Sequence, residues 1–491
     1  MESQGAAAAA APLLSKLPPA PEERQGAGGK ASSSLARKVW EESKKLGEVV
    51  GPAVFMNLVF SSMNIVSQSF SGHLGDLELA AFSMANTVID GFNFAMLLGM
   101  ASALETLCGQ AYGARQYHML GIYMQRSWLI LLSFAVLLSP MYVFSGRLLA
   151  ALGQPAELSR AAGSVAVYFL PAHFMYAALL PVMTFLQCQL KNWVTAAAAA
   201  AVFAVHVAAT WLLVSCLGLG IFGVAMAFNL SWITLAVLLV AYALGGGCPD
   251  TWSGFSTAAF VDLKEFVMLS ASSGVMVCLE NWYYRILLFL TGFMKNAELS
   301  VDALSICMSL SSLELMIHMG FLAGTGVRVA NELGAANGQG AKFATIVSTT
   351  TSFLISIFAS LLALIFHDKL AMIFSSSKAV IDAVDGISVL LAVTILLNGI
   401  QPVLSGVAIG SGWQGLVAYV NIGSYYLIGV PLGVLLGWGF NYGVPGVWAG
   451  MIGGTMMQTL ILALITLRCD WNEEVLARGT YLLAQGPVGR A

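Results

Sequence analysis

The sequence predicts an all-α membrane protein with twelve transmembrane helices in two pseudo-symmetric six-helix lobes. Composition is the first reason: 58% of the 491 residues are apolar and only 10% are charged, whereas soluble domains carry about 25% charged residues. The second reason is the number of long apolar windows, and the third is an internal repeat. The net charge of −3 gives no reason to expect a nucleic-acid partner.

Apolar windows of about 20 residues are long enough to cross a bilayer as helices. Twelve such windows are present, at 49–71, 82–108, 127–146, 161–186, 193–217, 221–244, 266–291, 303–327, 343–366, 386–411, 415–440 and 443–467. The joints between them carry turn-forming residues, such as Gly153-Gln154-Pro155. No segment between the windows is long enough to fold as a water-soluble domain.

Basic residues predict the orientation of the windows, because cytoplasmic loops carry an excess of Lys and Arg. With the N-terminus in the cytoplasm, 16 of the 22 Lys and Arg residues lie on the cytoplasmic side and 5 on the other side. Both termini are therefore expected to be cytoplasmic. Residues 1–34 lack the pattern of a signal peptide and, being rich in Ala, Gly, Ser and Pro, are expected to form a disordered tail.

The chain also repeats itself at an offset near 221 residues. Cys108–Ala114 matches Val329–Ala335, and Pro181-Val182 matches Pro402-Val403. Six windows per half give both halves the same direction in the membrane, so we expect two lobes related by an axis along the membrane normal, with a cavity between them. The expected domains are lobes at 35–245 and 266–470, a cytoplasmic loop at 246–265 and a cytoplasmic tail at 471–491.

Charged residues inside the windows are rare, and Glu280 is one of those that lie near the middle of a window. A charge at mid-bilayer costs at least about 2.5–3.5 kcal/mol, so such a residue usually faces a water-filled pathway or a partner. Glu280 is near the middle of the seventh window, in a polar and aromatic run that ends at Tyr284. A carboxyl group in such a half-dry site should hold a proton more tightly than in water, as proton-coupled exchange requires. The alternative is a structural acid bonded to a neighbouring helix.

Glu314 and His318 form a second candidate proton-coupling pair in the eighth window. They are four residues apart on one helical face, and histidine titrates near physiological pH. The alternative is a buried pair that holds two helices together. For Asp90, in the second window, local hydrogen bonding is the alternative to a place in the cavity. The candidates for lining the substrate cavity are Asp90, Asn281, Tyr284, Asn398 and Gln401.

Other functional classes find little support in the sequence. The seven cysteines form no CxxC pair and no metal-binding spacing with histidine, and no nucleophile motif is present. We therefore expect no enzyme, no cofactor and no metal site. A passive channel usually shows a repeated filter or rings of like charge, which the sequence lacks.

Several motifs together resemble those of the plant branch of the MATE family, the multidrug and toxic compound extrusion transporters that include the DETOXIFICATION proteins. The resemblance covers about residues 35–475. The matching motifs are Gly72–Gly75, Cys108–Gly113, Cys278–Tyr284, Arg328–Ala335 and Gly406–Gln414. The resemblance implies that Glu280 is the family's membrane acid of the seventh span. The chain departs from many relatives at Asn398, where they carry an acid, and at His318, where they carry proline.

The resemblance also implies the activity, a proton-coupled antiporter that exports small organic compounds or xenobiotics by alternating access. It implies substrates such as flavonoids, alkaloids, organic acids or hormones, and a vacuolar or plasma membrane. We expect the protein to act as a monomer in the bilayer. The alternatives are a flippase of lipids or lipid-linked substrates with the same architecture, and a passive channel.

Overall fold

The computed structural model describes residues 35–261, 263–292, 294 and 298–477. The predicted tail 1–34 lies outside these residues, as does most of the predicted tail 471–491. The described part of the chain is helical and has no strand, which confirms the predicted all-α class. Within it, eleven helices are long and apolar enough to cross a membrane.

The predicted seventh window lies in one further helix, α11 (Leu263–Gly292). This helix contains a polar run from Glu280 to Arg285. All twelve predicted windows therefore fall in helices.

By its internal contacts the chain divides into two compact units. We call Gly51–Cys278 the N-terminal unit, and Leu279–Ala491 together with Met1–Val50 the C-terminal unit. Both boundaries fall inside continuous helices, in α2 (Leu35–Leu74) and in α11. The predicted lobes instead divide the chain at the loop 246–265, so the two divisions differ in where they place residues 35–50 and 266–278.

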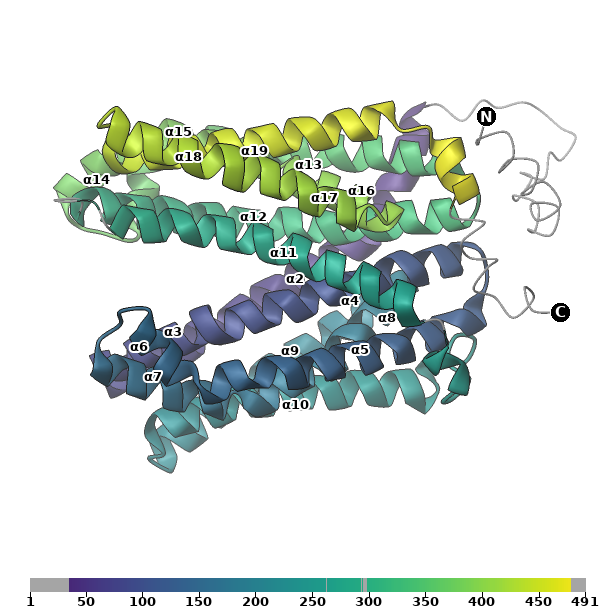
Figure 1. Cartoon of the computed structure of the whole chain (residues 1–491), viewed down its shortest axis with the longest axis horizontal. Coiled ribbons are helices and arrows are strands. Elements are labelled where there is room, and N and C mark those ends of the chain that lie inside the picture. The colour runs from purple at the N-terminus through teal and green to yellow at the C-terminus, as the bar shows by residue number, and fades with distance from the viewer. Residues whose placement is uncertain (1–34, 262, 293, 295–297, 478–491) are drawn as a thin grey trace, which may run out of the picture. The chain divides into compact units, whose positions relative to one another are not determined.

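The N-terminal unit contains most of α2, the start of α11 and the helices between them. These are α3 (Asp76–Met84), η1 (Ala85–Asp90), α4 (Gly91–Gly113), α5 (Tyr117–Val143), α6 (Ser145–Ala151), α7 (Ala156–Tyr168), α8 (Leu170–Cys188), α9 (Asn192–Thr210), η2 (Trp211–Cys216), α10 (Gly220–Tyr242), η3 (Ala243–Gly247) and η4 (Thr257–Phe260). The long helices pack side by side, α4 against α5 and α8, and α10 against α8 and α9 (Figure 1). The fourth window breaks at Phe169, because Pro171 in the first turn of α8 lacks the amide hydrogen that a continuous helix needs.

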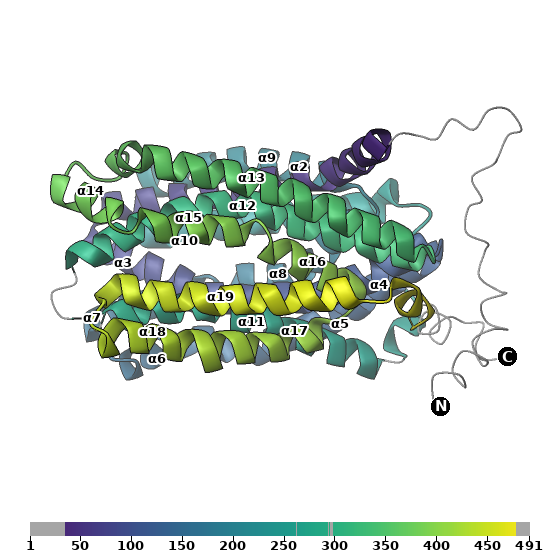
Figure 2. The ribbon, with the colours of Figure 1, turned by 90° about the horizontal axis from the view of Figure 1, so that it is seen from above.

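The C-terminal unit contains the start of α2, the end of α11 and all later helices. These are α12 (Glu298–Gly334), α13 (Gly338–Met372), α14 (Lys378–Asp385), α15 (Ser388–Asn398), α16 (Gln401–Ser411), α17 (Gln414–Asn421), η5 (Ile422–Gly429), α18 (Val430–Val434), η6 (Leu435–Gly439) and α19 (Gly443–Arg468). Figure 2 shows the segment from α17 to α18 running alongside α19.

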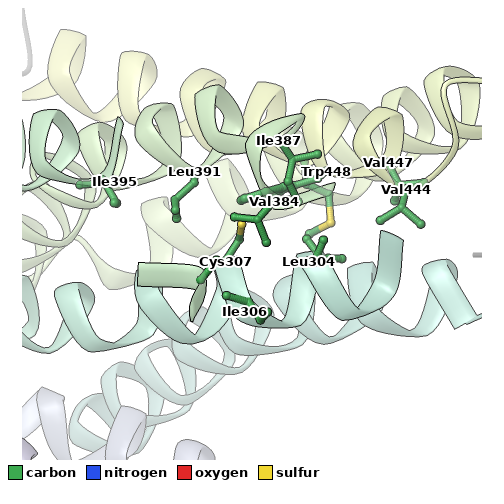
Figure 3. Close-up of a cluster of buried hydrophobic side chains, with 14 of the residues drawn as sticks. Leu304, Ile306, Cys307, Val384, Ile387, Leu391, Ile395, Val444, Val447 and Trp448 are labelled. Carbon is green, nitrogen blue, oxygen red and sulfur yellow. The ribbon is translucent and has the colours of Figure 1, made fainter. Parts of the chain in front are cut away.

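One end of the C-terminal unit holds a cluster of fully buried apolar side chains (Figure 3). Leu304 and Cys307 of α12 meet Val384 of α14, Leu391 of α15 and Trp448 of α19 there. Lipid tails are as apolar as these side chains, so van der Waals packing rather than exclusion of water stabilises such a cluster. The cluster ties α12, α14, α15 and α19 together and so anchors α15, which leads into the candidate site.

Helices α18 and α19 approach so closely that a glycine is required between them. A methyl group at Gly450 would collide with the backbone of Gly433 and lie 2.7 Å from the carbonyl carbon of Leu432. Gly450→Ala is therefore expected to destabilise the protein by about 1–3 kcal/mol. At Gly453, one turn along α19, the only close atom is the flexible end of Leu432, at 2.9 Å. Thermal unfolding in detergent should show a lower midpoint for Gly450→Ala and little change for Gly453→Ala; equal midpoints would contradict this account of the packing.

Candidate functional site

The candidate proton-coupling residues all belong to the C-terminal unit. Glu280 lies on α11 and Glu314 and His318 on α12, and the break between α15 and α16 supplies Asn398 and Gln401. The sequence explains this break: Pro402 has no amide hydrogen, and its ring would clash with the carbonyl four residues earlier in an uninterrupted helix. The tenth span is thus two short helices, and a polar amide stands at each side of the break.

Glu280 is partly buried and is held by an amide. The Nε2 group of Gln401 donates a hydrogen bond to Oε1 of Glu280 and another to Oγ of Ser405, at 3.2 Å. The phenol groups of Tyr284 and Tyr425 lie within electrostatic range of the carboxyl group. Within the described part of the chain, no basic side chain forms an ion pair with Glu280. Among these residues, therefore, no fixed positive charge neutralises the acid.

Aromatic side chains fix the segment of α11 that carries Glu280. Tyr283 stacks on Tyr425, with ring centroids 4.2 Å apart and planes 12° from parallel, and its hydroxyl donates to the carbonyl of Met451 at 2.8 Å. Tyr426 donates to the carbonyl of Leu279, also at 2.8 Å. These contacts hold the backbone on either side of Glu280 in place. None of them involves the carboxyl group of Glu280, which is bonded to the amide of Gln401.

Glu314 and His318 are in direct contact, as their spacing predicts. Nε2 of His318 lies against Oε1 of Glu314, and Asn398 donates to the other carboxylate oxygen at 3.0 Å. Nδ1 of His318 is 2.7 Å from the hydroxyl of Ser352 on α13. A serine hydroxyl can donate or accept, so it can serve the imidazole both with and without a proton on Nδ1.

Two further candidates for the substrate cavity are Asp90 and Asn281. Asp90 belongs to the N-terminal unit, where it is 4% exposed and accepts hydrogen bonds from Tyr142 at 2.9 Å and Tyr176 at 3.1 Å. Both its oxygens are engaged, which favours the local hydrogen-bonding role. Asn281 is exposed. A role in substrate contact for Asp90, Asn281, Tyr284, Asn398 and Gln401 stays a prediction.

Glu105, the other acid within a span of the N-terminal unit, is also buried. Its Oε1 atom has no hydrogen-bond partner among the described residues. Its backbone carbonyl lies 3.6 Å from the thiol of Cys188.

The hydroxyl groups around the two acids are the part that sequence reasoning missed. Ser352 contacts His318, Ser311 accepts from Asn398 at 3.1 Å, and Ser405 accepts from Gln401. The sequence does carry a signal for α13, where buried serines recur every four residues, at Ser348, Ser352, Ser356 and Ser360. Small polar residues at this spacing in an apolar window mark a face packed against other helices.

Comparisons with known proteins agree with this architecture. A family model described as MatE matches residues 52–212 and 273–435. Protein DETOXIFICATION 27 of Arabidopsis thaliana is 55% identical over 441 residues, which cover 90% of this chain and 91% of the relative. Protein DETOXIFICATION 26 of the same plant is 54% identical, over 90% of each chain.

Solved structures are similar along almost their whole length. The crystal structure of the eukaryotic MATE transporter AtDTX14 superimposes with a TM-score of 0.85 at 32% sequence identity, over 90% of this chain and 99% of that one. A mutant of the Vibrio cholerae transporter VcmN gives a TM-score of 0.78 at 16% identity, over 89% of this chain and 99% of that one, which shows a shared fold alone.

Proposed function

Since the chain belongs to the MATE family of efflux transporters, and is thus a multi-pass membrane protein and not an enzyme, we propose that it exports small organic compounds in exchange for protons. Glu280 is the proton-coupling group in this proposal. The observation that carries it is the pairing of a partly buried membrane acid with an amide instead of a basic side chain. An amide offers both a donor and an acceptor, so Gln401 can bond to Glu280 with or without its proton.

The proposed transport cycle follows from the gain and loss of a proton by Glu280. A proton arriving from the acidic side neutralises Glu280 and weakens its charge-assisted hydrogen bond with Gln401. Bound substrate then leaves, and the proton is later lost to the cytoplasm as access alternates between the two sides. Substrates of the flavonoid, alkaloid, organic acid or hormone classes, and a vacuolar or plasma membrane, are part of the proposal. The excess of basic residues on one side supports cytoplasmic termini.

Transport by the purified protein in sealed vesicles tests this function. With a pH gradient as the only driving force, a substrate from one of these classes should accumulate against its concentration gradient. Collapse of the pH gradient by a protonophore should stop the accumulation. Flux that only runs downhill would instead indicate a channel, and movement of a labelled phospholipid between leaflets without accumulation of solutes would indicate a flippase.

His318→Phe tests whether the second acid takes part in proton coupling. Without the imidazole, Glu314 loses the titratable group that it contacts, so, if the pair takes part in coupling, the midpoint of the pH profile of export should shift by about one pH unit. His206→Asn is the matched control, because His206 is equally buried but lies in the N-terminal unit, where it contacts Ser67 and Ser231. The control is expected to keep the midpoint of the parent protein. An unchanged profile in His318→Phe would remove the pair from the mechanism.

A further inference from the structure

The short break between α15 and α16 contacts both candidate acids at once. On one side of the break, Asn398 donates to Glu314. On the other side, three residues later, Gln401 donates to Glu280. The two acids lie on different helices, α12 and α11, so this segment of four residues is their shared neighbour.

Gly399, inside the break, lies directly against α13. A methyl group at this position would collide with the Cβ and Oγ atoms of Ser356 and lie 3.3 Å from the carbonyl oxygen of Ser352. Ser356 is fully buried and its hydroxyl is bonded to the carbonyl of Phe353 at 2.8 Å, so it has little freedom to move away. The break is therefore seated on the same turn of α13 that offers the Ser352 hydroxyl to His318.

Space, and not backbone conformation, explains the glycine. Gly399 has φ −69° and ψ −19°, values that any L-residue adopts readily. What distinguishes the position is the missing side chain, which lets the break approach α13 closely. An added methyl group would push the break away from α13 and take the amides of Asn398 and Gln401 with it.

We propose that Gly399 is a positioning residue for both acids, because it seats the break so that Asn398 and Gln401 reach Glu314 and Glu280 together. This inference rests on the proposed proton coupling and adds that a single packing contact, made by a residue that bonds to neither acid, sets the protonation of both sites. Among the residues that the structure describes, the other titratable groups that face the acids are His318 for Glu314, and Tyr284 and Tyr425 for Glu280. From α13 and the break, the described contacts are hydroxyl and amide groups only.

Gly399→Ala, with export in vesicles measured as a function of pH, tests the proposal. The two amides donate hydrogen bonds that favour the charged carboxylates, so their withdrawal should move the midpoint of the pH profile to higher pH, by about one pH unit. Ser356→Gly removes the atoms with which the new methyl group collides. The double variant Gly399→Ala/Ser356→Gly should therefore return the midpoint to that of the parent protein.

Gly423→Ala is the control for an added methyl group, because no atom lies within 4 Å of the position that the new carbon would occupy. It should leave the profile unchanged. A loss of export rate in Gly399→Ala without a shift in the midpoint, or a shift that Ser356→Gly fails to reverse, would overturn the inference. If instead the parent protein shows no export driven by pH, the proposed function itself fails, and the two failures are thereby distinguished.

Discussion

Glu280→Gln is expected to reduce proton-driven export to the level of vesicles that contain no protein. Glutamine has nearly the shape of the protonated acid and can still bond to Gln401, so the protein should insert and fold normally. Glutamine cannot lose a proton, however, so the side chain at position 280 stays neutral and cannot take part in proton exchange. The measurement is accumulation of substrate under an imposed pH gradient, with the amount of inserted protein determined on the same vesicles.

Glu105→Gln is the matched control for this substitution. Glu105 is also an acid within a span, but it belongs to the N-terminal unit, and the hydrogen bonds of Gln401 and Asn398 go to Glu280 and Glu314 instead. We expect this variant to retain export driven by pH. Full activity of Glu280→Gln would contradict the role of Glu280, and equal loss in both variants would show that the effect is not specific to it.

The second large effect is expected at Arg328, which holds two carboxylates. Its guanidinium group makes a two-pronged contact with Glu42, with Nε to Oε1 at 2.8 Å and Nη2 to Oε2 at 3.1 Å. Nη2 also contacts Oε1 of Glu332 at 2.5 Å, and the other oxygen of Glu332 accepts from Asn337. The side chain of Arg328 is 7% exposed and that of Glu42 is 10% exposed. This buried cluster fastens the start of α2 to the end of α12 within the C-terminal unit.

Arg328→Met should destabilise the protein by about 3 kcal/mol, because it removes the guanidinium group that the buried carboxylate of Glu42 and the partly buried carboxylate of Glu332 share. The more exposed Lys45, 3.8 Å from Glu42, compensates only part of this loss. Denaturant unfolding of the protein in detergent would measure the loss. The double variant Arg328→Met/Glu42→Leu should regain part of the stability, since the buried charge of Glu42, by then close only to Lys45, is gone as well. If Arg328→Met is as stable as the parent protein, the cluster does not fasten α2.

The spans and the acids could be predicted because each depends on local sequence. Long apolar runs define helices without knowledge of their neighbours, and an acid inside such a run stands out because it is costly there. The contact of Glu314 with His318 followed from their spacing on one helix. The sequence likewise marked Asn398 and Gln401 as polar residues of the tenth span.

The partners of these residues could not be predicted, because they come from distant parts of the chain. Gln401 is 121 residues from Glu280, and Asn398 is 84 residues from Glu314. Arg328 and Glu42 are 286 residues apart. Because this contact is not visible in the sequence, residues 35–50 were expected in the N-terminal lobe, whereas the contacts of the structure place them in the C-terminal unit. Only the packing of helices brings such groups together, and one sequence carries no record of that packing.

Proton release on substrate binding tests the role of Glu280 most directly. The purified protein in weakly buffered solution with a pH indicator should release protons in proportion to the substrate that it binds. In Glu280→Gln, binding of the same amount of substrate should release far fewer. Undiminished release from Glu280→Gln would show that the exchanged proton resides on another group.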